Sequence, residues 1–228
     1  MSSTEGGPNI VTNGLVFYVD AANPKSYVSG DTTTNDLISN ITGTLENGVG
    51  YSIDNNGSWS FDGTDDFVNC GSVFTDTNSK TFMCWANFDS FAVGYSKHTM
   101  AKWDASLGKR TLELVCNNNF LYFLISSNGR SFTSHSNSQP LSIGVWYFLV
   151  GVYDLSNNKI KSSINGQAFQ ETNYSNGMNS SDSELLIGGV DNTGRMDGKI
   201  SLSMVYNRAL SATEVLQNYN ATKTRFGL

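Results

Sequence analysis

The chain has 228 residues and a formal net charge of −6, with 15% charged and 12% aromatic residues. This length is enough to bury the core of one large β-sandwich, which uses about 200–250 residues. Asn, Ser, Thr and Gly are abundant, and such a composition favours strands and turns over helices. Because the chain is acidic and has no Lys/Arg cluster, we expect no nucleic-acid partner.

The sequence gives no sign of a membrane or of an oxidising compartment. It has no apolar run long enough to span a bilayer, and its first residues lack the apolar segment of a signal peptide. We therefore expect no membrane partner and synthesis in the cytoplasm. Cys70, Cys84 and Cys116 are odd in number and lack metal-binding spacing, so they predict buried free thiols.

In chain order, residues 1–13 are polar and are predicted to form an N-terminal arm. Leu15–Val19 is the first strong strand signal, and Trp59–Val68 indicates a strand, an Asp-Gly turn and a second strand. Further strands are predicted at sandwich-like spacing over Thr81–Phe88, Thr111–Val115, Phe120–Ile125, Val145–Tyr153, Ile160–Ile164 and Leu185–Ile187.

The last fifth of the chain predicts two strands and a helix. A short apolar run, Leu185–Gly189, and a partly alternating run ending at Tyr206 are joined by a loop with an Asp197-Gly198 turn. Ser211-Ala-Thr-Glu214 has the spacing of a capping box, in which the Ser and Glu side chains satisfy each other's backbone N–H groups. A short helix is therefore predicted from Ser211 onward.

Three of these motifs resemble the laminin-G-like, concanavalin A-like jelly-roll domains. They are the opening Gly14–Pro24, the run Phe61-Asp-Gly-Thr-Asp-Asp-Phe-Val68 and the closing Tyr206-Asn-Arg-Ala-Leu-Ser211. The resemblance covers roughly residues 14–220. It implies an all-β fold, an antiparallel jelly-roll β-sandwich over residues 14–221 with a short C-terminal helix, followed by a tail at 222–228. It also implies that the strand ending at Tyr206 runs through the middle of the sandwich.

The fold does not decide the function, because this sandwich carries lectins, glycan hydrolases and structural modules alike. Glycoside hydrolysis needs two carboxylates that face each other, and glucanases of this architecture place them on one strand as Glu-x-Asp-x-Glu or Glu-x-Asp-x-x-Glu. Glu113 and Glu184 have no acidic partner that continues this spacing. His98 and His135 are predicted to lie in loops without a nucleophile motif. We therefore expect no catalytic residues and no enzyme.

Related domains often hold one calcium ion at the rim of the sandwich. Calcium takes six to eight oxygen ligands, and carboxylates beside glycine turns suit it. The carboxylates at such turns are Asp20, Asp62, Asp65, Asp66 and Asp197, and of these Asp20, Asp62 and Asp197 are the predicted ligands. The alternative is that Asp62 and Asp197 only stabilise their own Asp-Gly turns. We expect no cofactor other than, at most, this calcium ion.

A sugar site needs an aromatic platform surrounded by hydrogen-bonding groups. The stretch from Gly94 to Asp104 offers Tyr95, His98, Trp103 and Asp104, which are the predicted carbohydrate-binding residues. Relatives carry a similar Lys-Trp-Asp here, so the alternative is that Trp103 covers the edge of the core.

Short chains of this type that end like Asn220–Leu228 resemble virion proteins of tailed bacteriophages. This resemblance implies a non-enzymatic structural protein of the virion surface, a capsid decoration or tail-associated protein made in the host cytoplasm and docked on other virion proteins. Arg225, Phe226 and Leu228 are the predicted docking residues, although a tail folded back on its own sandwich would also explain the aromatic side chain. The alternative function is a carbohydrate-binding or receptor-binding module that adsorbs the particle to host or environmental glycans.

Overall fold

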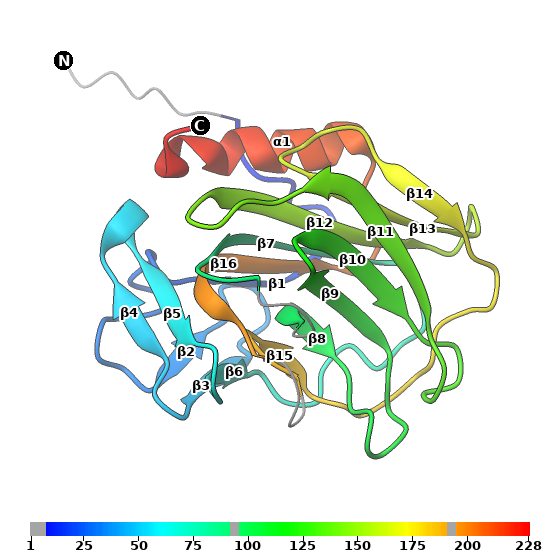
Figure 1. Ribbon diagram of the computed structural model, residues 1–228, viewed down its shortest axis with the longest axis horizontal. Helices are drawn as coiled ribbons and strands as arrows, with labels where there is room; N and C mark the ends of the chain where they lie inside the picture. The colour runs from blue at the N-terminus through cyan, green and yellow to red at the C-terminus, as the bar shows by residue number, and fades with distance from the viewer. Residues whose placement is uncertain (1–7, 92–95, 191–194) are drawn as a thin grey trace.

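The computed structural model describes residues 8–91, 96–190 and 195–228 (Figure 1). Within these ranges, two antiparallel sheets of eight strands each pack face to face, and one short helix lies near the C-terminus. The predicted all-β jelly-roll sandwich is thus confirmed. In the described part of the chain, no helix is long and apolar enough to cross a membrane.

Sheet 1 is the sheet that carries the helix. Its strands lie in the order β14 (Gln170–Asn173), β13 (Lys159–Ile164), β12 (Trp146–Asp154), β7 (Lys80–Phe88), β16 (Asp197–Tyr206), β5 (Ser58–Asp62) and β4 (Gly50–Ser52), and β1 (Leu15–Asp20) also pairs with β16. The long strand β16 therefore lies in the middle of sheet 1, as the closing motif predicts.

Sheet 2 is the opposite layer. Its strands lie in the order β11 (Thr133–Pro140), β10 (Phe120–Ile125), β9 (Leu112–Asn117), β8 (Lys97–Lys102), β15 (Leu185–Ile187), β6 (Phe67–Asn69), β3 (Thr42–Glu46) and β2 (Thr33–Asn35). A short 3-10 turn at Asp54–Asn56 precedes β5.

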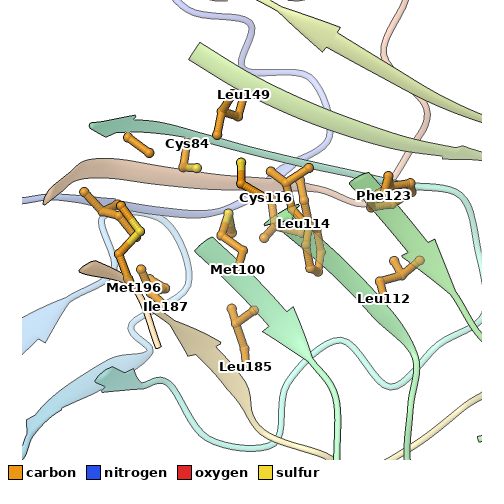
Figure 2. Packing of buried hydrophobic residues seen from close by; sticks show 14 of the residues in the cluster. Cys84, Met100, Leu112, Leu114, Cys116, Phe123, Leu149, Leu185, Ile187 and Met196 are labelled. Carbon is orange, nitrogen blue, oxygen red and sulfur yellow. The ribbon is translucent and has the colours of Figure 1, made fainter. Parts of the chain in front are cut away.

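Strand β7 shows how the sequence produces layers. All nine of its residues are buried, and successive side chains of a strand point to opposite faces. Phe82 and Cys84 belong to the main core between the sheets, where Cys84 and Leu149 of sheet 1 meet Cys116 of sheet 2 (Figure 2). Met83 and Trp85 point the other way, into a second apolar cluster under the helix. Strand β7 is therefore buried on both faces.

Helix α1 (Ala212–Thr222) covers the outer face of sheet 1 (Figure 1). The predicted capping box is present, because the Ser211 hydroxyl accepts from the Glu214 amide and the Glu214 carboxylate accepts from the Ser211 amide at 2.8 Å. Val215 and Asn218 are the buried positions of the helix. The Asn218 side chain accepts from the Val11 amide at 2.8 Å, which fixes the described end of the N-terminal arm.

The Asp197-Gly198 pair does not form the predicted turn. Both residues lie inside β16, and the preceding strand β15 belongs to the other sheet. Gly198 has φ +140, and a Cβ at this position would collide with the Asn87 carbonyl oxygen of β7. The glycine thus permits a close approach of two backbones rather than a chain reversal.

Strands β8 and β11 are among those that were not predicted, and they correct the placement of both histidines. His98 lies in β8 and His135 in β11, not in loops. His135 is buried, and its ring nitrogens lie 3.0 Å from the Ser162 hydroxyl of β13 and 2.8 Å from the Thr172 hydroxyl of β14. These hydrogen bonds connect the edges of the two sheets, so β11 forms without apolar alternation because its polar side chains find partners across the sandwich.

Candidate functional site

The candidate site lies on the outer face of sheet 2. In β9 the side chains of Leu112, Leu114 and Cys116 are part of the main core. Because side chains alternate along a strand, Glu113, Val115 and Asn117 point to the opposite face. The same alternation in β10 places Tyr122 and Leu124 beside them. Two adjacent strands thus present a mixed aromatic, acidic and amide surface away from the core.

A pocket of about 240 Å³ opens on this face. We call it the sheet 2 pocket, and its lining consists of Ser96, His98, Glu113, Val115, Asn117, Tyr122, Leu124, Phe132 and Ser134. Ser96 and Phe132 immediately precede β8 and β11, and the other residues come from β8, β9, β10 and β11, so the pocket exists only once four strands are assembled.

Phe132, which lines the sheet 2 pocket, forms an aromatic pair with Trp103. Phe132 is 53% exposed, and its ring centroid lies 5.5 Å from that of the buried Trp103 in an edge-to-face arrangement. The guanidinium carbon of Arg110 lies 5.7 Å from the Trp103 centroid and 5.9 Å from the Phe132 centroid. Arg110 also donates to the Arg130 carbonyl, so the cation is held against both rings.

A second pocket, of about 380 Å³, has Trp103 in its lining. We call it the loop pocket; its lining comprises Ser72, Trp103, Asp104, Leu107, Lys109, Asp182, Ser183, Glu184 and Leu186. The Lys109 ammonium lies 2.8 Å from the Asp182 carboxylate, and both side chains reach solvent. Such an exposed ion pair contributes little to stability.

Glu113 and His98 form a hydrogen-bonded pair inside the sheet 2 pocket. The Glu113 carboxylate is only 2% exposed, and it contacts Nδ1 of His98 through Oε1. Nδ1 of His98 and Oε1 of Glu113 thus share one hydrogen bond. Burial lowers the pKa of His98 to about 3, helped by the nearby charges of Arg195 and Lys97. The imidazole is therefore neutral at neutral pH.

The three predicted sugar-binding residues that the structure describes line two different pockets. His98 lines the sheet 2 pocket, whereas Trp103 and Asp104 line the loop pocket. Tyr95 lies outside the described residues. Trp103 is only 8% exposed, packed with Ala101 and Val190, so it supports the neighbouring Phe132 rather than offering a platform itself.

The predicted calcium ligands are not brought together either. The Asp20 carboxylate pairs with the Arg225 guanidinium at 2.7 Å, and the Asp197 carboxylate contacts Ser90 and lies 3.8 Å from the Lys97 ammonium. Both carboxylates already have partners within the fold. Asp20 and Asp197 are therefore poor candidates for a shared ion.

The carboxylate group that Asp62 joins is made with Asp65 and Asp66, the other candidate carboxylates of its turn, and does not include Asp20 or Asp197. Ligand oxygens of Asp62, Asp65 and Asp66 lie within 4.8 Å of one another, and we call these residues the acidic turn. Burial raises the pKa of Asp66, and the charges of Asp62 and Asp65 also act in this direction. These residues fit part of a calcium site, because they would supply three of the six to eight oxygens.

The C-terminal residues pack on their own sandwich. Phe226 is 8% exposed and stacks on Trp85, with ring centroids 4.1 Å apart. Arg225 donates from Nε to the Asn55 carbonyl at 2.6 Å, as well as pairing with Asp20. Of the predicted docking residues, Leu228 alone is exposed, at 48%. The alternative that the tail folds back is therefore what the structure shows.

Sequence reasoning missed the principal lining residues Phe132, Tyr122 and Asn117, and it weighed Glu113 only as a catalytic acid. The signal was present in part, because Glu113 and Val115 alternate with apolar residues along the predicted strand Thr111–Val115, although Asn117 lies beyond its predicted end. Phe132 carried no such signal, since it precedes a polar strand that was not predicted.

The family comparison matches the larger part of the chain. The profile described as the concanavalin A-like lectin/glucanases superfamily matches residues 62–216. None of the curated protein sequences compared with the chain matches it.

Solved structures with the same fold have low sequence identity to the chain. Domain 4 of AbnA, an extracellular arabinanase from Geobacillus stearothermophilus, in complex with arabinotriose, is 14% identical, with a TM-score of 0.67 and coverage of 94% of this chain and 100% of that one. The binding domain of Paraclostridial Mosquitocidal Protein 1 is 13% identical, with a TM-score of 0.70 and coverage of 91% and 52%. Trypanosoma rangeli sialidase in complex with the inhibitor DANA is 12% identical, with a TM-score of 0.66 and coverage of 96% and 36%. The chain thus spans about a third of the sialidase and half of the mosquitocidal binding domain, and these likenesses show the fold alone.

Proposed function

Because the chain belongs to the concanavalin A-like lectin/glucanase superfamily, we propose that it is a carbohydrate-binding module. The proposed site is the sheet 2 pocket together with the exposed ring of Phe132. The observation that carries the proposal is the combination of an exposed aromatic ring with a carboxylate, an amide and two serine hydroxyls in one pocket. Sugar sites combine an apolar platform with a few convergent polar groups.

The relatives support a binding function of this kind. AbnA domain 4, which is matched over its full length, was solved with arabinotriose, and the mosquitocidal protein relative is a binding domain. Both show that the same sandwich serves in binding modules. The glycan bound by this chain is a separate question, because the identities are too low to transfer a ligand.

We expect binding without hydrolysis. A glycosidase needs two carboxylates across the scissile bond, roughly 5–9.5 Å apart. The sheet 2 pocket has one carboxylate in its lining, that of Glu113, and the next outward positions of β9 are Val115 and Asn117. The same strand therefore lacks the second acid that the glucanase arrangement requires.

The expectation of a virion surface protein stays a prediction. It used the aromatic side chain of the tail as a docking residue, whereas Phe226 is buried against Trp85. A decoration or tail protein of this fold would have to dock through another surface. The virion role and the glycan-binding role do not exclude each other, because the alternative function predicted from the sequence is adsorption of a virion to host or environmental glycans.

The experiment that tests the proposal is glycan binding by Phe132→Ala. We expect the wild-type protein to bind oligosaccharides displayed on a glycan array. Phe132→Ala should weaken that binding at least about tenfold, which is equivalent to about 1.4 kcal/mol. Ile143→Ala is the matched control, because Ile143 is 59% exposed and outside the pocket linings described above. Wild-type protein that binds no glycan, or Phe132→Ala that binds as well as the control, would refute the proposal.

A further inference from the structure

The chain contains six Asn-Gly pairs, and none of their asparagines lines the sheet 2 pocket. An asparagine in this setting is chemically labile, because the backbone nitrogen of the next residue can attack the carbon of the side-chain amide. A glycine in the next position has no side chain to hinder that attack. The fold decides which pairs can react, since it can hold either group in place. The pairs begin at Asn13, Asn47, Asn56, Asn128, Asn165 and Asn176.

In two of the pairs, hydrogen bonds hold the asparagine side chain. The Asn47 side-chain amide donates to the Asp65 carbonyl at 2.9 Å. The Asn165 side-chain oxygen accepts from the Phe148 amide at 2.9 Å. Rotating either side chain towards the following nitrogen would break its hydrogen bond, and this loss adds to the barrier of the reaction.

In two further pairs, the glycine nitrogen is engaged. The Gly57 amide donates to the Asp54 carbonyl at 3.1 Å, and the Gly129 amide donates to the Ser126 hydroxyl at 2.9 Å. The nitrogen must give up its proton before it can attack, and in both pairs this proton is held by an acceptor. These pairs are therefore protected as well.

The pair Asn13-Gly14 is covered by a neighbouring side chain. A Cβ at Gly14 would lie 2.9 Å from both Arg208 Nε and the Asn207 side-chain oxygen. Arg208 Nε also donates to the Asn13 carbonyl at 2.9 Å, and its guanidinium pairs with Glu214. Ring closure at Asn13 would have to displace this guanidinium.

Asn176 and Gly177 are under none of these restraints. They lie in the connection from β14 to β15 (Figure 1). Asn176 is exposed, and within the described ranges neither its side chain nor the Gly177 nitrogen makes a hydrogen bond. The Tyr174 hydroxyl donates to the Gly177 carbonyl at 2.7 Å, which leaves the nitrogen of Gly177 free. Gly177 has φ +76, and apart from its chain neighbours no heavy atom lies within 4 Å of the place of a Cβ.

We propose that Asn176 is a site of spontaneous deamidation and reacts before the other five asparagines. The Gly177 nitrogen gives its proton to a base and bonds to Cγ of Asn176, which closes a succinimide ring. The bond from Cγ to the side-chain nitrogen breaks, and this nitrogen takes up a proton and leaves as ammonia. Water then opens the ring at either carbonyl and gives aspartate or isoaspartate. This inference is independent of the proposed glycan binding.

The test is peptide mapping of the folded wild-type protein during storage in a mildly alkaline buffer below its Tm. Mass spectrometry follows the replacement of amide by carboxyl at each Asn-Gly pair, and chromatography separates the isoaspartyl peptides. We expect Asn176 to react at least about tenfold faster than any other pair, equivalent to about 1.4 kcal/mol in activation free energy. The other five pairs are matched controls in the same sample.

The same chain unfolded in urea separates the effect of the fold from that of the local sequence. In urea the six rates should converge to within a few fold, because the restraints on the five protected pairs are lost. Each deamidation adds one negative charge, so ion exchange gives a second measurement. Asn176→Gln should lack the first acidic species to appear, since its longer side chain closes the corresponding ring far more slowly. Faster reaction at another pair in the folded protein, an equal lead of Asn176 in urea, or an unchanged first acidic species in Asn176→Gln would overturn the inference.

Discussion

Replacing Phe226 by alanine should destabilise the whole sandwich. The ring is 8% exposed and stacks on Trp85 at 4.1 Å, and it also lies 4.8 Å from the Trp146 ring centroid. Truncating a buried phenylalanine costs about 3–5 kcal/mol, and we expect about 3 kcal/mol because this residue packs at the edge of the second apolar cluster. In a chain of this size each kcal/mol lowers Tm by about 2–4 °C, so the predicted fall is about 6–12 °C.

The assay is urea and thermal unfolding of three purified variants. Arg225→Ala should also be destabilised, by about 1–3 kcal/mol, since it leaves the Asp20 carboxylate and the Asn55 carbonyl without their partner. Leu228→Ala is the control, because its side chain is 48% exposed and should change stability by less than about 0.5 kcal/mol. Wild-type stability of Phe226→Ala would refute the reasoning, since it would mean that the tail is detached in solution and free to dock on a partner.

Three further predictions concern other parts of the molecule. The Arg208 guanidinium holds the pKa of the Glu214 carboxyl group at about 2, below its usual 4.5, so the pair stabilises the fold fully above about pH 4.5 and loses this effect as the pH falls towards 2. The stability advantage of the wild-type protein over Glu214→Gln in urea unfolding should therefore disappear in acid, and an equal advantage at about pH 7 and about pH 3 would contradict this. Gly151→Ala should cost about 1–3 kcal/mol in the same assay because a Cβ there would collide with the Phe123 ring of the opposite sheet, and a neutral substitution would show that the sheets pack more loosely. Calcium bound at the acidic turn should raise Tm, with a stabilisation of about 2.7 kcal/mol at a hundredfold excess over Kd, and a melting curve unchanged between calcium and chelator would remove the proposed ion.

Periodic segments were predictable from sequence because their signal is local. Strand β12 is an almost continuous run of large apolar residues, and its observed range, Trp146–Asp154, differs by one residue at each end from the predicted Val145–Tyr153. The capping box was equally predictable, since its two hydrogen bonds lie within four residues. Strand β11 was missed because its buried polar residues, such as His135, are satisfied by partners in another strand.

The candidate site was harder to predict because it depends on pairings that are distant in the sequence. A search for paired acids on one strand led us to set Glu113 aside, whereas its structural partner His98 comes from the neighbouring strand β8. Asp20 was a reasonable calcium ligand until the fold placed Arg225, 205 residues away, against it. Side chains with local turn chemistry are thus reassigned by contacts that no local pattern contains.

The most direct test of the claim that the sheet 2 pocket binds glycans is a crystal structure of the protein with an oligosaccharide that it binds on the array. We predict a sugar ring packed against Phe132, with a hydroxyl group within about 3.2 Å of the Glu113 carboxylate, the usual limit for such a hydrogen bond. A sugar bound instead at another pocket, such as the one between Tyr27 and Tyr51, with the sheet 2 pocket holding only water, would contradict the assignment.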